Sequence, residues 1–305
     1  MTFDTLIING LIIDGTGKKS YHADIGIREE KIDAIGQLKE SGTAEQIIDA
    51  AGHVVCPGFI DVHTHSDLTL LVNGLGESKI KQGVTTEVIG NCSFSPYPVV
   101  ENRLPDIVSA MNKVYETEFE WTWRDLDGYA TCLEESGISL NVVPLLGHST
   151  LRIAAMGYSQ RPPTADELEM MNRLAAATME QGAYGLSTGL TLVPSSFAQA
   201  EEIISLCKTV ADYGGLYSTH IRIWAGAHRT AIEEAIEIGK RAGLPVHLAH
   251  QAIIDSRHWG EADSITTMME EARKDGVDVT YDVYPYTAAG TYLSQLIPQW
   301  SVEGG

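Results

Sequence analysis

The stretch "PGFIDVHTHSD", residues 57–67, ends an apolar run with two histidines and two aspartates. A short run of apolar and β-branched residues is typical of a buried strand. Side chains two positions apart on a strand point to the same face, so His63 and His65 are predicted to lie side by side. This spacing lets two imidazoles reach one cation. The stretch therefore predicts a metal site at the end of a strand.

The segments that follow repeat the pattern of an apolar strand and then an amphipathic helix. Strand candidates include "VTTEVIGNC", "ISLNVVPLLGH", "GLYSTHI" and "LPVHLAH", while residues 164–183 and 229–243 have the apolar spacing of helices. Alternating strands and helices predict an α/β fold with a parallel sheet. Seven evenly spaced strand units favour a TIM-like (β/α)8 barrel over residues 58–305, with the eighth strand missing from these residues.

The segment before this pattern has a different character. Residues 1–57 contain short β-rich stretches such as "TLIINGLIIDGTG", in which Asn-Gly and Asp-Gly are hairpin signals. We therefore expect a small β-domain at residues 1–57, ahead of the barrel.

The composition excludes several classes of partner. The 305 residues carry 41 acidic and 21 basic side chains, a formal net charge of -20, which argues against nucleic acid and anionic membranes. No apolar run approaches the ~18 residues of a membrane helix, and the N-terminus lacks the pattern of a secretory signal. Four cysteines without a CxxC pair predict reduced thiols, so we expect a cytoplasmic protein. The oligomeric state does not follow from the sequence.

Metal-capable side chains recur where the predicted strands end. In a barrel of parallel strands these ends share one face, on which the reactive residues lie. Imidazole and thiolate ligands together favour Zn²⁺ over Ca²⁺ or Mg²⁺, which prefer oxygen. A single strand-end histidine is more often structural, but the recurrence favours a zinc site. The candidates are His63, His65, Cys92, His148, His220 and His250.

Several longer motifs resemble one enzyme family. "GFIDVHTHSD" is similar to the first-strand motif of the metal-dependent amidohydrolase superfamily. "KQGVTTEVIGNCSFSPYP", "GAYGLSTGL", "GLYSTHIR" and "VDVTYDVYPYTA" narrow the resemblance to the N-acyl-D-amino-acid deacylase (D-aminoacylase) family. The resemblance implies zinc-dependent hydrolysis of the amide bond of N-acyl-D-amino acids or related N-acyl amides, which gives a carboxylic acid and an amine. The expected partner is thus a small N-acyl amino acid.

The resemblance also implies roles for the ligand candidates. Cys92, His220 and His250 match the ligands of a tightly held zinc ion, and His63 and His65 match the pair of a second, weaker site. We interpret His63 and His65 as catalytic residues as well. The general-base aspartate of the superfamily ends the eighth strand, so we expect it beyond Gly305.

Three further residues are predicted to contact substrate, each with a structural alternative. His148 could bind substrate or make a structural hydrogen bond, Arg222 could contact an anion or form an outward salt bridge, and Tyr284 could contact substrate or pack in the core. The chain departs from the family at Leu192, Ile223, Trp224 and Ala252. At the last of these the family has a lysine that holds the substrate carboxylate. We therefore expect broad acceptance of hydrophobic acyl amides and a relaxed dependence on that carboxylate.

Two other functions stay open. A cyclic-amide hydrolase of the dihydroorotase or hydantoinase type uses related chemistry, but such enzymes usually place a carboxylated lysine at a strand end, which "STGL" does not supply. The second alternative is a non-catalytic barrel fragment, because seven strands alone would leave a barrel open. Metal content together with turnover of an N-acyl-D-amino acid would separate these three interpretations.

Overall fold

The computed structural model describes residues 1–115, 120–222 and 228–291, together with 295, 297, 301 and 302. Ile223 and Trp224 lie outside the described residues. The chain divides into two compact units, Met1–Phe59 and Ile60–Gly305. Each unit is described by itself.

The first unit is a β-sheet, as predicted, but Asn9-Gly10 lies at an irregularity within β1 and does not form a hairpin turn. Its strand order is β3-β2-β1-β4, and β5 also pairs with β1. The hairpins β1–β2 and β2–β3 are antiparallel, whereas β4 and β5 run parallel to β1. Glu29 and Glu30 make the β2–β3 turn with φ of 50° and 62°, the sign that a tight two-residue hairpin turn requires. The strands are β1 (Thr2–Ile12), β2 (Tyr21–Arg28), β3 (Lys31–Gly36), β4 (Thr43–Asp49) and β5 (Val54–Val55).

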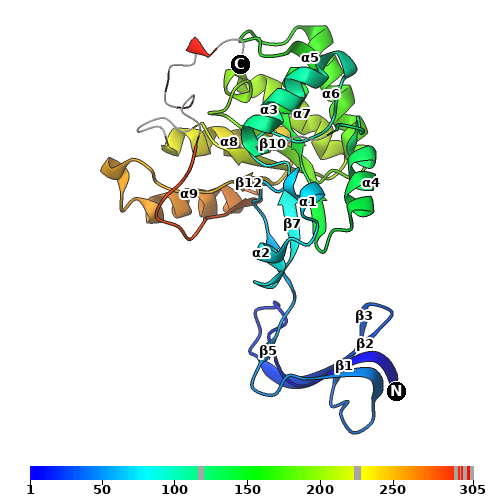
Figure 1. The fold of residues 1–305 in the computed structure, drawn as a ribbon. Helices are drawn as coiled ribbons and strands as arrows, with labels where there is room; N and C mark the ends of the chain where they lie inside the picture. The colour runs from blue at the N-terminus through cyan, green and yellow to red at the C-terminus, as the bar shows by residue number, and fades with distance from the viewer. Residues whose placement is uncertain (116–119, 223–227, 292–294, 296, 298–300, 303–305) are drawn as a thin grey trace. The chain divides into compact units, whose positions relative to one another are not determined.

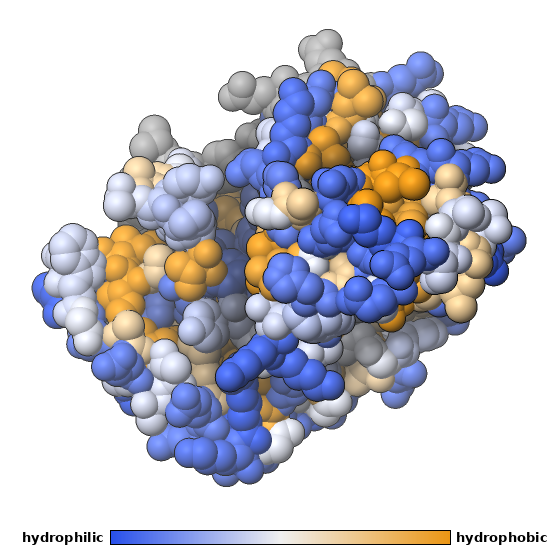
Figure 2. Space-filling view, turned by 90° about the horizontal axis from the view of Figure 1, so that it is seen from below, coloured by the Kyte–Doolittle hydropathy of each residue, from blue (hydrophilic) through white to orange (hydrophobic). Residues whose placement is uncertain are grey.

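Asp24 on β2 ties this sheet to the segment that follows it. Its carboxylate accepts hydrogen bonds of 2.8 Å from the backbone N–H groups of Asn9, Leu38 and Lys39. Burial raises the pKa of Asp24, but these hydrogen bonds lower it more, so its pKa is below the usual value. Isoleucines of β3 and β4 (Ile32, Ile35, Ile47 and Ile48) are exposed. In the view of Figure 2, hydrophobic side chains in orange are visible at the surface between hydrophilic ones.

The second unit is a mixed α/β structure with parallel strands, which confirms the predicted α/β class with a parallel sheet. One sheet has the order β6-β7-β8 and another the order β13-β12-β11-β10-β9. The pairs β7–β8, β9–β10, β10–β11, β11–β12 and β12–β13 are parallel. β8 ends the first sheet and β9 ends the second, and only Leu145 separates these two strands in the chain. Taken together, the strands of the two sheets therefore follow one another in chain order. They are β6 (Phe59–Asp61), β7 (Val84–Ile89), β8 (Asn141–Pro144), β9 (Leu146–Gly147), β10 (Gly185–Gly189), β11 (Leu216–His220), β12 (Val246–Leu248) and β13 (Val279–Tyr281).

Helices connect these strands and lie around them (Figure 1). Both long helices predicted from apolar spacing are present, as α6 and α8. Thr164 and Glu167 form a reciprocal capping box that starts α6. The helices are α1 (Thr69–Val72), α2 (Glu77–Ile80), α3 (Leu104–Tyr115), α4 (Leu126–Ser136), α5 (His148–Met156), α6 (Ala165–Glu180), α7 (Ala200–Asp212), α8 (His228–Ala242) and α9 (Ala262–Lys274), with 3₁₀ turns η1 (Glu101–Arg103), η2 (Ser195–Phe197) and η3 (Ser256–His258).

One hydrophobic cluster lies between the strands and the helices. Each of the principal strands contributes an apolar side chain with essentially no exposure, and burying such a side chain contributes about 1.5–3 kcal/mol. These residues are Ile89, Leu146, Leu186, Tyr217, Leu248 and Val279. The core thereby fixes the positions of the strand ends, where the candidate ligands lie. Among the described residues no helix has the length and apolar character needed to cross a membrane.

The first strand is shorter than the sequence predicted. β6 ends at Asp61, so His63 and His65 follow the strand instead of lying on it. Thr64 between them continues the alignment with β7, because its backbone N–H and its hydroxyl both donate to the carbonyl oxygen of Val88, at 3.2 and 2.8 Å. The side chain of Thr64 is therefore tied to β7 while the two imidazoles are held on the other side of the segment.

Candidate metal centre

Cys92 stands at the centre of the site, three residues after β7. Cys92 and Ser93 adopt left-handed backbone conformations with φ of 51° and 76°. Such conformations are unfavourable for residues with a Cβ and persist only where neighbours hold them. Ser187 donates its hydroxyl to the carbonyl of Gly90 and accepts the Ser93 N–H at 3.2 Å, and the Ser93 hydroxyl lies 2.8 Å from that of Ser149. These buried serines hold the turn that presents the Cys92 thiol.

Four imidazoles surround this thiol. The Sγ atom of Cys92 lies 3.3 Å from Nε2 of His63 and 3.5 Å from Nε2 of His250. Ring centroids are 5.4 Å apart for His63 and His65, 4.9 Å for His63 and His250, and 4.5 Å for His220 and His250. The histidines come from the ends of β6, β11 and β12, so three strand ends converge on the end of β7. The structure thus brings together all five predicted ligands.

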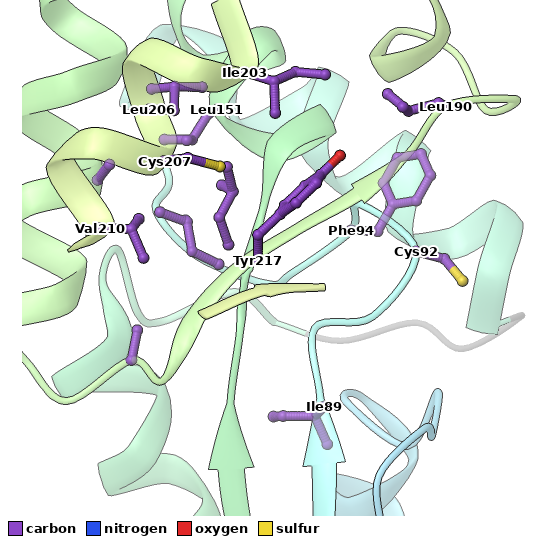
Figure 3. Packing of buried hydrophobic residues seen from close by; sticks show 14 of the residues in the cluster. Ile89, Cys92, Phe94, Leu151, Leu190, Ile203, Leu206, Cys207, Val210 and Tyr217 are labelled. Carbon is purple, nitrogen blue, oxygen red and sulfur yellow. The ribbon is translucent and has the colours of Figure 1, made fainter. Parts of the chain in front are cut away.

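The histidines change the chemistry of the thiol. Burial raises the pKa of Cys92, but hydrogen bonding to His220, His250, His63 and His65 outweighs it and holds the pKa well below its usual value. Cys207 on α7 is the opposite case, since burial alone raises its pKa far above the usual value. Figure 3 shows Cys207 among Leu206, Leu151 and Tyr217, whereas the Cys92 side chain points away from this group. The thiolate form of Cys92 is therefore favoured, which makes Cys92 a metal ligand candidate, whereas Cys207 is an inert core residue.

Asp282 supports the imidazole of His63 from the other side. Burial lowers the pKa of His63, but the Asp282 carboxylate and the Cys92 thiolate raise it to about 10. Oδ2 of Asp282 lies 3.5 Å from Nδ1 of His63 and accepts a 2.8 Å hydrogen bond from Nε2 of His247. In the absence of a cation, His63 is thus the positively charged partner of two anions. A bound cation would replace the Nε2 proton on the side of Cys92.

The donor set fits a borderline-soft cation. Within the described part of the chain, one group of three possible ligands has all its donor atoms within 4.8 Å of one another: His63, Cys92 and His250. One thiolate with imidazoles is a ligand set that zinc prefers. His220 is also beside Cys92, but its Nε2 atom lies 2.7 Å from the hydroxyl of Thr191, which leaves Nδ1 for a cation. The geometry thus adds His63 to the three ligands that the family resemblance implied for the tight site.

His65 and His63 line a cavity of about 450 Å³. His65 is exposed, unlike the half-buried His63. Charged groups also lie at the cavity: Nζ of Lys79 is 2.5 Å from a carboxylate oxygen of Asp61 and 3.7 Å from one of Glu87. A polar small molecule could therefore reach His65 from this side. The lining residues are His63, Thr64, His65, Ser66, Thr69, Leu70, Asn73, Gly76, Ser78, Lys79 and Glu87.

His148 lies apart from the thiol, in a buried polar network. It is the first residue of α5, is fully buried, and has both ring nitrogens bonded: Nδ1 lies 2.8 Å from the Ser195 hydroxyl and Nε2 lies 2.9 Å from Glu202. Glu202 also binds Arg152 at 2.5 Å. Burial lowers the pKa of His148, so the ring is neutral. These contacts favour the structural hydrogen bond over the substrate contact as the role of His148.

The other two predicted substrate residues differ in their surroundings. Arg222 pairs with Glu234 on α8 at 3.2 Å and donates to the backbone carbonyls of Ser196 and Ala198 at 3.0 and 2.9 Å. This matches the salt-bridge alternative. Tyr284 is half-buried and comes two residues after Asp282. Its contact with substrate stays a prediction.

Three residues that shape the site were not among the predicted site residues. They are Asp282 and His247, which meet beside His63, and Thr191, which meets His220. Their sequence signals were weak, because a threonine after a strand and an aspartate in a strand are common in structural roles. Of the three, only Asp282 directly follows a strand, β13, and so shares the strand-end position of the predicted metal ligands.

Comparison with known proteins identifies the family. Residues 46–300 match the model of the amidohydrolase family. The chain therefore belongs to the amidohydrolase family.

Among its relatives are deacylases of known name. The chain is 37% identical over 293 residues to D-aminoacylase of Alcaligenes xylosoxydans xylosoxydans, covering 96% of this chain and 59% of that protein. It is 36% identical over 292 residues to N-acyl-D-glutamate deacylase of the same organism, covering 95% and 58%. A crystal structure of N-acyl-D-glutamate deacylase from Bordetella bronchiseptica, complexed with zinc and a phosphonate inhibitor, superimposes with a TM-score of 0.87 at 37% identity, covering 94% of this chain and 59% of that one. The chain thus spans about three fifths of the length of these relatives.

Proposed function

We propose that the protein hydrolyses the amide bond of N-acyl-D-amino acids or related N-acyl amides, with zinc held at the Cys92 centre. The observation that carries this proposal is the Cys92 thiolate surrounded by four imidazoles at the strand ends. Cys92, His220 and His250 would hold a tight zinc ion, with His63 as a neighbouring donor. His63 and His65 would form the weaker second site and contact the reacting groups.

The architecture of the whole protein belongs to the same proposal. The parallel strands β6 to β13 follow one another in chain order, which supports a TIM-like barrel closed by an eighth strand outside these 305 residues. Residues 1–57 would be a small β-domain and residues 58–305 the barrel portion. The similarity to D-aminoacylase and N-acyl-D-glutamate deacylase over 95–96% of the chain favours a deacylase over a cyclic-amide hydrolase.

The chain's own residues set the conditions for the reaction. The chemistry that zinc supplies when bound is Lewis acidity, which activates water and polarises a carbonyl at neutral pH. Hydrolysis also requires a carboxylate that takes a proton from water and gives it to the leaving nitrogen. Asp282 is a poor candidate, because its two oxygens already face His247, His63 and the backbone N–H of His250. We therefore assign the general base to an aspartate beyond Gly305.

The proposed substrate choice rests on a position at which the chain departs from the family. Ala252, two residues after His250, carries no charge where the family resemblance implies a lysine that holds the substrate carboxylate. A site that hydrogen-bonds a substrate group rejects ligands lacking that group, whereas a site without this contact discriminates only weakly. We propose that hydrophobic N-acyl amides are accepted with or without a free carboxylate.

The experiment combines metal analysis of the purified chain with a substrate panel on a protein extended to the length of its relatives. Zinc content is measured for the parent and for Cys92→Ser, and turnover is measured for N-acyl-D-amino acids, their L enantiomers, their esters, and a hydantoin. We expect about one tight zinc per chain in the parent, loss of zinc in the variant, and turnover of the N-acyl compounds in a protein extended to the length of its relatives. Equal zinc in both proteins, or turnover of the hydantoin alone, would contradict the proposal.

A further inference from the structure

We propose that Asp282 is a positioning residue that aims the Nε2 atom of His63 and the side chain of His250 at Cys92. The proposal rests on the function proposed above and adds a role for a residue that does not itself contact the thiol. Three separate contacts of one carboxylate carry it.

The first contact lies on the backbone of His250. This residue has a left-handed conformation with φ of 38°, two residues after β12. Such a conformation persists in a residue with a Cβ only where its surroundings determine it. Oδ1 of Asp282 accepts the His250 N–H at 2.8 Å, and the carbonyl oxygen of Asp282 accepts the N–H of Gln251 at 2.9 Å. Asp282 therefore binds the turn on both sides of the His250 peptide group.

The second contact lies on the imidazole of His63. Oδ2 of Asp282 is 3.5 Å from Nδ1, while Nε2 on the opposite side of the ring is 3.3 Å from Sγ of Cys92. A metal-binding histidine usually donates its remaining ring N–H to a carboxylate or carbonyl, and this partner fixes the orientation and the tautomer. The carboxylate faces Nδ1 at an ion-pair distance, which favours a proton on that nitrogen and leaves Nε2 directed at Cys92.

The third contact holds the carboxylate itself in place. Nε2 of His247 lies 2.8 Å from Oδ2 of Asp282, and Nδ1 of the same ring lies 2.8 Å from the hydroxyl of Thr280 on β13. The side chains of Asp282 and His247 are only 13% and 15% exposed, so water screens the arrangement little. The paired strands β12 and β13 therefore hold the Asp282 carboxylate in place. Through its contacts this carboxylate in turn positions His63 and His250.

The test removes the charge of Asp282 and keeps its size. We expect Asp282→Asn to weaken zinc binding by about 10–100-fold, the usual effect of losing the partner of a metal ligand. Asp278→Asn is the matched control, because Asp278 is an exposed aspartate just ahead of β13 in the same segment. Affinity is measured by competition with a chromophoric chelator, and Co²⁺ substitution reports the thiolate charge-transfer and d–d bands. We expect the Asp282 variant alone to change these bands.

A double-mutant cycle separates positioning from general stabilisation. If Asp282 acts through His63, replacing it with asparagine should weaken zinc binding less in a His63→Ala background than in the parent, by a factor of at least roughly three. The reason is that the effects of residues sharing a partner are not additive. Full additivity, or unchanged zinc affinity in Asp282→Asn, would overturn the proposal.

A measurement on the unaltered protein keeps the question decidable if the variant does not fold. Histidine ¹⁵N resonances of the parent, assigned by their loss in His63→Gln, should show a proton on Nδ1 of His63, both without metal and with zinc. An unprotonated Nδ1 would overturn the role of Asp282. A parent that binds no zinc would contradict the proposed function, and the metal-free spectrum would still decide between the two outcomes for Asp282.

Discussion

The hydroxyl of Thr191 lies 2.7 Å from Nε2 of His220, at the end of β11. Thr191 follows β10, so the contact joins the ends of two neighbouring parallel strands. It leaves Nδ1 as the nitrogen of His220 that can face a cation beside Cys92. His63 and His250 are turned the other way, with Nε2 toward the sulfur. Nε2 of His220 is thus held by Thr191, while His63 and His250 direct Nε2 at the sulfur.

Thr191→Val removes this hydroxyl and keeps the shape of the side chain. We expect zinc affinity to fall by about 10-fold, because His220 loses the contact that fixes its ring. Chelator competition measures the change, and thermal melting checks that the fold is kept. Thr267→Val on α9, an exposed threonine whose hydroxyl bonds to the carbonyl of Asp263, is the control and should bind zinc like the parent. Equal affinity in both variants would show that Thr191 does not position His220.

The two buried cysteines should separate metal binding from stability. Cys92→Ser is expected to lose tight zinc with little change in the free energy of unfolding of the metal-free protein. Cys207→Ala should keep zinc but lose about 1 kcal/mol, because it removes a buried atom from the packed core around Leu206 and Tyr217. Zinc analysis and urea unfolding provide the two readouts. The assignment of Cys92 fails if Cys207→Ala is the variant that loses zinc.

Glu202 holds together the buried network of His148 and Arg152. Replacing it with glutamine leaves the Arg152 charge buried without its partner, which should cost about 3 kcal/mol of unfolding free energy. Glu201→Gln is the adjacent control, since Glu201 pairs with Arg241 at the surface and exposed ion pairs contribute little. If His148 acts mainly in this network, Glu202→Gln should leave zinc affinity unchanged. A stable Glu202→Gln protein with weakened zinc binding would point instead to a role at the metal centre.

Acid should weaken the start of α6. The Arg161 guanidinium beside Glu167, helped by hydrogen bonds from Thr164, lowers the pKa of Glu167 from 4.5 to about 2 in the folded chain. The folded state therefore binds this proton less readily than the unfolded state, so the stabilisation is present above pH 4.5 and is lost as the pH falls toward 2. Glu167→Gln should flatten the dependence of the melting temperature on pH in this window. An unchanged pH profile between parent and variant would refute the assignment.

Much of the fold followed from local pattern. The apolar spacing in residues 164–183 and 229–243 predicted α6 and α8, since one face of each helix is buried and this face recurs every three to four residues. Asn-Gly and Asp-Gly signals placed a β-sheet at the N-terminus. The extent of the first strand was predicted less well. β6 stops at Asp61, and Thr64 keeps the segment that carries His63 and His65 beside β7 by bonding to Val88 through both its backbone and its side chain.

The sequence by itself determined which residues could meet. Cys92, His220 and His250 each come at or just after a parallel strand, and parallel strands in chain order bring their carboxyl ends to one edge. Ligand type was equally local, because imidazole and thiolate chemistry belongs to the residue.

Only the tertiary structure decided how these residues meet. The left-handed turn at Cys92 depends on Ser187, 95 positions away in the chain, and the ring of His63 faces Asp282, 219 positions away. Hydrogen bonds act over about 3 Å and require alignment, so they depend on strand register and core packing to a precision that no sequence spacing conveys. The orientations of the His63, His220 and His250 rings, and the lowered pKa of the Cys92 thiol, follow from those contacts.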